Sequence, residues 1–117
     1  MTATEEQQES SSEFCSSPEL NKQFLGTFDK FDVFLVSGEF IRNNLEIDFT
    51  MGSHHHVSDY IPNGEVWLDD KLSENDLKAL IHHEVHELKL MRAGVSYEEA
   101  HKLATESEER FRKKNFG

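Results

Sequence analysis

The stretch that decides the fold runs from Ser73 to Gly94 and reads SENDLKALIHHEVHELKLMRAG. Its apolar side chains recur three or four residues apart, which is the spacing of one face of an α-helix. These side chains are Leu77, Leu80, Ile81, Val85, Leu88 and Met91. Ser73 followed by Asp76 is typical of a capping box, and Gly94 is a favourable C-terminal stop. The stretch therefore predicts a helix over residues 74–92.

A second helical pattern follows this glycine. Ser96, with Glu99 three residues later, again marks a helix start, and the sequence predicts a helix over residues 97–113. The apolar stripe of this helix consists of Tyr97, Ala100, Ala104 and Phe111. Because only a short glycine turn separates the two helices, we expect an antiparallel hairpin with Tyr97 in the core.

Short β-forming runs separated by turn signals precede the hairpin. The predicted strands cover residues 32–36, 39–42, 45–49, 57–61 and 65–68. Ser17-Pro18 predicts a short helix through Leu25 ahead of them. The links between the strands are too short for crossovers, which indicates antiparallel pairing. The sequence therefore predicts an α+β fold, a small antiparallel β-sheet followed by a two-helix hairpin, with Trp67 as a core aromatic.

Composition divides the chain of 117 residues into a tail and a domain. Residues 1–19 contain five acids, no base and few apolar side chains, so we expect a disordered acidic tail before a single domain over residues 20–117. The net charge of −11 argues against duplex nucleic acid and anionic membranes as partners. A single cysteine, Cys15, permits no disulfide within the chain. No secretion signal or membrane span is recognisable, so a cytoplasmic protein is expected.

The histidines are concentrated in a few places. They are His54, His55, His56, His82, His83, His86 and His101. At about 100° per residue, Glu84 falls within the apolar stripe of the first helix, with His83 and Glu87 on its flank. His82 and His86 fall nearly opposite, which predicts that they face solvent. A carboxylate at a core position is costly unless it is paired, protonated or near a cation, so Glu84 indicates a neighbouring charge.

Packing of the two helices is expected to bring His101 beside His83 and Glu87. Two histidines and a carboxylate are a common ligand set of catalytic zinc, and the same set suits iron or manganese. Glu84 would then take a proton from a water activated by the metal. Without a metal, these residues would form a buried hydrogen-bonded cluster.

The sequence leaves three roles open. Glu84 pairs with Arg42 or Arg92 if no cation is present. One histidine of residues 54–56 approaches the site as a ligand or substrate contact, or the run is a plain loop. Glu108, on the second helix, orients a metal ligand or pairs with a base.

Residues 83–87, HEVHE, resemble an HExxE variant of the HExxH motif of zincins. The resemblance implies a zincin-like fold in which His83 is a ligand, Glu84 is the general base and Glu87 replaces the second histidine. Most of residues 31–111 is also similar to small uncharacterised domains of phage and mobile-element proteins. That second resemblance implies no activity.

Two functions follow from these residues. The first is a small metal-dependent hydrolase, peptidase-like, in which strand 65–68 lines the substrate cleft as the corresponding strand does in zincins. The alternative is a non-catalytic binding or adaptor protein of phage or mobile-element origin, with a structural metal or polar cluster and a protein or peptide partner. A carboxylate-bridged di-iron site is disfavoured because it usually takes four helices and the sequence predicts two.

Overall fold

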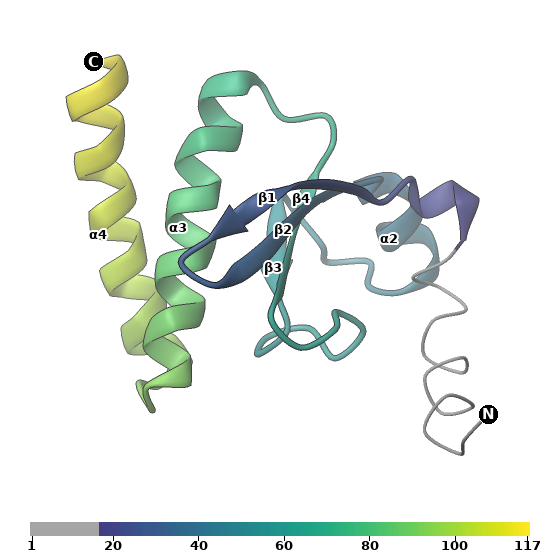
Figure 1. Ribbon diagram of the computed structural model, residues 1–117, viewed down its shortest axis with the longest axis horizontal. Coiled ribbons are helices and arrows are strands. Elements are labelled where there is room, and N and C mark those ends of the chain that lie inside the picture. Colours follow the sequence, from purple (N-terminus) through teal and green to yellow (C-terminus); the bar gives the residue numbers. More distant parts are fainter. Residues whose placement is uncertain (1–16) are drawn as a thin grey trace.

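The computed structural model describes residues 17–117, which form a β-sheet with helices packed against it (Figure 1). The elements are η1 (Pro18–Leu20), β1 (Gln23–Phe28), β2 (Phe31–Val36), α2 (Gly38–Asn44), β3 (Gly52–His54), β4 (Glu65–Asp69), α3 (Glu74–Arg92) and α4 (Tyr97–Phe116). Of the tail expected over residues 1–19, residues 1–16, with Cys15, lie outside the described residues. Pro18 and Glu19, which the sequence assigns to that tail, belong to η1, whose Leu20 is buried.

The described strands pair in the order β1-β2-β4-β3, and the sheet is mixed rather than antiparallel as predicted. β1 and β2 form an antiparallel hairpin, and β3 is antiparallel to β4. β2 and β4, however, run parallel, with Val33 opposite Val66. The parallel pair is possible because residues 37–64 between the two strands hold α2, β3 and the loops that join them, which is enough chain for a crossover. The α+β class is confirmed.

Two predictions in the first third of the described chain are wrong for local reasons. Residues 39–42, predicted as a strand, lie within α2, because the Ser37 hydroxyl accepts a hydrogen bond from the backbone nitrogen of Phe40 and caps a helix there. The helix predicted to reach Leu25 ends after one turn, because Asn21 adopts a left-handed conformation with φ of 53°. The chain then enters β1.

The strands predicted between α2 and β4 are also absent from the described structure, which has β3 there instead. Residues 45–49 turn, since the backbone nitrogen of Phe49 donates to the carbonyl of Glu46. Residues 57–61 turn as well, since two backbone nitrogens there donate to the carbonyl of His54. The apolar residues of these segments therefore belong to loops, in which Phe49 and Ile61 are buried and Ile47 and Val57 are exposed.

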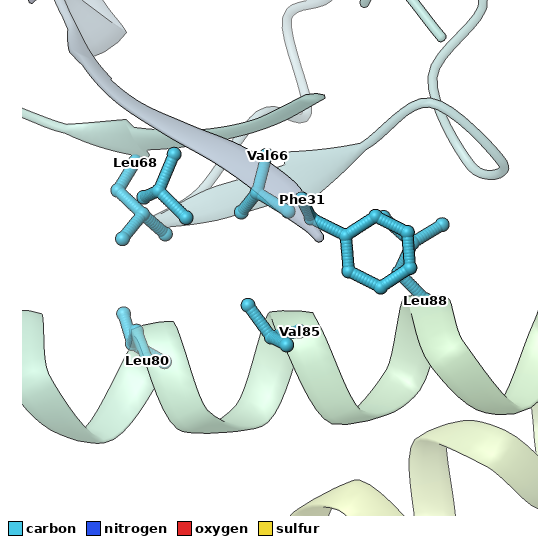
Figure 2. Packing of buried hydrophobic residues seen from close by; sticks show 7 residues of the cluster. Phe31, Val66, Leu68, Leu80, Val85 and Leu88 are labelled. Atoms are coloured by element: carbon cyan, nitrogen blue, oxygen red, sulfur yellow. The ribbon is translucent and has the colours of Figure 1, made fainter. Parts of the chain in front are cut away.

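α3 covers one face of the sheet and builds a core cluster with it (Figure 2). The buried members are Phe31, Val33, Val66 and Leu68 from the sheet and Leu80, Val85 and Leu88 from α3. A second cluster consists of Leu20, Val36, Ile41, Phe49, Ile61 and Trp67. Successive side chains of a strand point to opposite faces, so Val66 and Leu68 meet α3 while Trp67 faces the second cluster. Trp67 is fully buried, which confirms it as a core aromatic.

α3 and α4 lie side by side as the predicted hairpin (Figure 1). The bounds of α3 agree with the predicted 74–92, and α4 continues to Phe116, beyond the predicted residue 113. Gly94 closes the turn with φ of 100°, a conformation that favours glycine. Tyr97, predicted in the core, is 45% exposed and stacks on His101 at the surface instead. No helix within residues 17–117 has the length and apolar character to cross a membrane.

The start of α3 provides a test of the capping interpretation. The Ser73 hydroxyl accepts a hydrogen bond from the backbone nitrogen of Asp76, so Ser73→Ala leaves that donor without its cap. We expect the variant to lose about 1 kcal/mol of unfolding free energy, measured by urea denaturation. Asn75→Ala, at an exposed position on the same turn, is the control and should change stability little. Equal effects of the two substitutions would contradict the capping role.

Candidate metal centre

The carboxylate of Glu87 is the point on which three histidines converge. Glu87 is 3% exposed, on the face of α3 that meets the sheet and α4. Its Oε1 lies 2.7 Å from Nε2 of His54, and its Oε2 lies 2.8 Å from Nδ1 of His101. Nε2 of His83 lies 3.3 Å from the same Oε2. An ionised carboxylate only accepts hydrogen bonds, so the facing histidine nitrogens of His54 and His101 donate.

The helical hairpin explains why His83 and His101 meet. His83 and Glu87 are one helical turn apart and therefore share a face of α3. His101 lies near the start of α4, which packs against the end of α3, and the rings of His83 and His101 are 5.1 Å apart. The structure thus brings together His83, Glu87 and His101, the residues that the sequence proposed as ligands.

The cluster is open to solvent on the α4 side. The side chain of His101 is 50% exposed, whereas that of His83 is 6% exposed. The Tyr97 ring stacks on His101 with centroids 5.4 Å apart. Burial raises the pKa of Tyr97, and the negative charges of Glu87 and Glu84 raise it further. His101 and Tyr97 therefore form the solvent-exposed edge of the cluster.

Glu84 is buried beside this cluster, and no group within residues 17–117 is hydrogen-bonded to its carboxyl group. Its side chain is 12% exposed, and Nε2 of His83 lies 4.0 Å from its Oε2. The basic partners considered from the sequence are elsewhere: Arg42 lies 3.4 Å from Asp69, and Arg92 lies over the ring of Phe31. Burial, followed by repulsion from Glu87, raises the pKa of Glu84 to about 8. The carboxyl group is therefore mostly protonated at neutral pH.

Glu87 and His83 shift in the opposite sense, as expected of a charged pair. Burial acts to raise the pKa of Glu87, but hydrogen bonds from His54, His83 and His101 outweigh it and lower the pKa well below its usual value. Burial acts to lower the pKa of His83, but its hydrogen bond with Glu87 and the nearby carboxylates outweigh it and raise the pKa. The two carboxyl groups, one turn apart on α3, therefore differ in protonation state at neutral pH. Glu87 is ionised and Glu84 is protonated.

Glu108 lies behind His83, on the far side of its ring. Oε1 of Glu108 is 3.0 Å from Nδ1 of His83, although the approach lacks the direction of a hydrogen bond and Nδ1 has no hydrogen-bond partner. Nε of Arg112 donates to Oε2 of Glu108, and its Nη1 donates to Asp76 at the start of α3. Glu108 therefore pairs with a base, one of the two roles left open by the sequence, and its role in orienting a ligand stays a prediction.

The three neighbouring histidines at residues 54–56 have different surroundings. His54 is fully buried at the end of β3, and His56 is exposed. Nδ1 of His55 accepts a hydrogen bond from the backbone nitrogen of Gly64, and burial together with His56 lowers the pKa of His55 to about 4. Only His54 joins the cluster. The sequence could not select it, because the choice depends on how β3 pairs with β4.

His82 and His86 are not the solvated residues that helix phase predicted. Both are half-buried, and Nε2 of His82 lies 2.6 Å from Oγ of Ser107. The ring of His82 stacks on Phe111 of α4 with centroids 4.9 Å apart. The prediction failed because α4 covers more of α3 than its apolar stripe indicated. Both histidines border a groove of about 380 Å³ with an apolar floor that includes Val85, and none of the cluster around Glu87 lines it.

The donor atoms around Glu87 suit a divalent cation. Ligand atoms of His83, Glu87 and His101 lie within 4.8 Å of one another, and so do those of His54, Glu84 and Glu87. Nitrogen and oxygen donors of this kind bind zinc at about 2 Å, and iron or manganese accept the same types. The buried Glu84 carboxyl also has no hydrogen-bonded partner in the described part of the chain, and a nearby cation would balance its charge. The residues therefore fit a metal ion.

The protein therefore combines an α+β fold with a histidine–glutamate cluster. This cluster lies between β3, at one edge of the sheet, and the hairpin of α3 and α4. Comparisons with family models, curated proteins and solved structures found no match for this chain.

Proposed function

We propose that this protein is a metal-dependent hydrolase, peptidase-like, in which His83, Glu87 and His101 hold a zinc ion. The convergence of these three side chains, with ligand atoms within 4.8 Å, is the observation that carries the proposal. The resemblance of residues 83–87 to the zincin motif agrees with it. The half-exposed His101 leaves the centre accessible to water and substrate.

Each neighbouring residue has a role in this proposal. When bound, the zinc ion would lower the pKa of a coordinated water and polarise a substrate carbonyl. A bound cation would favour the ionised form of Glu84. Glu84 could then accept and return a proton, because it is buried beside the ligands and no other group holds it by a hydrogen bond in the described chain. The charges of Glu84 and Glu87 balance one divalent cation. Glu108, held by Arg112, would keep His83 in place.

Metal analysis of purified protein tests the centre. We expect about one zinc per chain in protein prepared without a nickel column, because a set of two histidines and one carboxylate binds one ion. His83→Ala and His101→Ala should lose it, and a chelator should lower the melting temperature of the wild type but not of these variants. His56→Ala removes an exposed histidine and should keep the metal. Absence of stoichiometric metal from the wild type would end the proposal.

A second candidate function, a non-catalytic adaptor of phage or mobile-element origin, is favoured by the groove beside His82 and His86. Its lining includes Ile81, Val85 and Phe111 but not Glu87. Such a groove suits an apolar segment of a partner protein. The two functions separate on activity, since an adaptor with a structural metal would bind zinc but cleave no peptide in a fluorogenic peptide library.

A further inference from the structure

His54 is the buried histidine that the proposed ligand set does not use. It is the last residue of β3, where its backbone pairs with Val66 of β4. Its side chain is fully buried, so the pairing of β3 with β4 fixes where the ring lies. An imidazole buried with no role would be costly, because its nitrogens lose their hydrogen bonds to water. Within residues 17–117, Nε2 of His54 is hydrogen-bonded to Glu87 and Nδ1 has no hydrogen-bond partner, so the contact with Glu87 is the one that can explain the position of the ring.

The two oxygens of Glu87 face different partners. Oε1 accepts from Nε2 of His54 at 2.7 Å, while Oε2 faces His101 at 2.8 Å and His83 at 3.3 Å. The oxygen that His54 holds is thus turned away from the two candidate ligands. A carboxylate held in this way offers a single oxygen to a cation beside His83 and His101.

A second cation between His54, Glu84 and Glu87 is the competing explanation, because their ligand atoms also lie within 4.8 Å of one another. Charge argues against it. Two carboxylates balance one divalent cation, and a second ion would leave two uncompensated positive charges in a buried site.

We infer that His54 is a positioning residue that holds Oε1 of Glu87, so that Glu87 binds the metal through Oε2 alone and a coordination position stays open. This inference rests on the proposed metal centre. Hydrogen-bonded partners of metal ligands typically account for a 10- to 100-fold change in metal affinity. A bidentate Glu87 would instead occupy the position that a hydrolase needs for water.

Two substitutions at this position separate positioning from direct ligation. His54→Leu removes the donor, and we expect zinc affinity, measured by competition with a chromogenic chelator, to fall 10- to 100-fold. His54→Gln carries an amide that can donate to the same oxygen, so it should recover most of that affinity. The visible spectrum of the cobalt-loaded His54→Gln protein should match that of the wild type, because the ligands are unchanged. His56→Leu, on the exposed neighbour, should behave as wild type.

Each other result overturns the inference. Unchanged zinc affinity in His54→Leu would mean that the hydrogen bond from His54 does not affect how Glu87 binds the metal. A loss in His54→Gln as large as in His54→Leu, with an altered cobalt spectrum, would make His54 a ligand. Two cobalt ions per chain in the wild type would establish the second cation. A wild type that binds no metal overturns the metal centre together with this inference, whereas a metal-binding wild type with insensitive His54 variants overturns the inference alone.

Discussion

Glu84→Gln is expected to make the metal-free protein more stable at pH 8 and the zinc-loaded protein far less active. Burial raises the pKa of Glu84 from 4.5 to about 8. A carboxyl group whose pKa is raised on folding contributes stability that is present below 4.5 and is lost as the pH rises through 8. Glutamine carries no charge at any pH and has nearly the same shape. Because one pKa unit corresponds to about 1.4 kcal/mol, we expect a gain of a few kcal/mol at pH 8 and little change at pH 4.5.

The same substitution removes the proposed proton acceptor. A positioned general base typically contributes 10²- to 10⁴-fold to a rate, so peptide hydrolysis by the zinc-loaded variant should fall by about that factor. Zinc content should not change, because Glu84 is not one of the proposed ligands. An activity near that of the wild type would remove Glu84 from the mechanism.

Urea denaturation in the presence of chelator, at pH 4.5 and pH 8, measures the stability change. His83 also has a raised pKa and loses its stabilising contribution as the pH rises, and the charge of Glu84 is one cause of that raised pKa. The difference between the variant and the wild type therefore measures Glu84 together with its interaction with His83. Glu106→Gln, at an exposed position of α4, is the control and should show no such pH dependence. A variant less stable than the wild type at pH 8 would contradict the buried, unpaired state of Glu84.

The helical half of the fold could be predicted because its signals are local. The apolar spacing of residues 74–92 and the serine caps at Ser73 and Ser96 depend on side chains within one or two turns, and the structure has both helices. The sheet depends on non-local pairing. β2 and β4 run parallel although no local pattern specifies this direction. Residues 39–42, predicted as a strand, form part of α2 because Ser37 caps a helix there.

The candidate site likewise contains residues that local signals predict and residues whose positions depend on non-local pairing. His83, Glu84 and Glu87 share one helix, and His101 follows across a short turn, so helix phase and the hairpin were enough to group them. His54 required the register of β3 against β4. The sequence does not show which of the three neighbouring histidines is buried. Strand alternation places His55 on the opposite face from His54 and His56, but it does not distinguish between those two. The partial burial of His82 likewise depended on how far α4 covers α3.

Glu87→Gln should have the opposite effect on the metal-free protein, although it is the same substitution one turn along α3. Glu87 is ionised and accepts hydrogen bonds from His54 and His101, so its lowered pKa contributes stability above 4.5 that is lost only as the pH falls below that value. Glutamine has one acceptor oxygen and presents an amide donor to a ring nitrogen that also donates. Breaking a buried charged network typically costs about 3–5 kcal/mol, and we expect a loss of that order at pH 7.

Zinc binding should fail in the same variant, because a neutral amide replaces the anionic ligand on which the histidines converge. We expect the affinity to fall by more than 100-fold, at least as far as for loss of a residue that only supports a ligand. Parallel chelator competition and urea denaturation of Glu84→Gln and Glu87→Gln make each variant the control for the other. We expect the two substitutions to change the stability of the metal-free protein in opposite directions, and only Glu84→Gln to retain zinc. If both substitutions changed stability in the same direction, the assignment of an ionised Glu87 and a protonated Glu84 would be wrong.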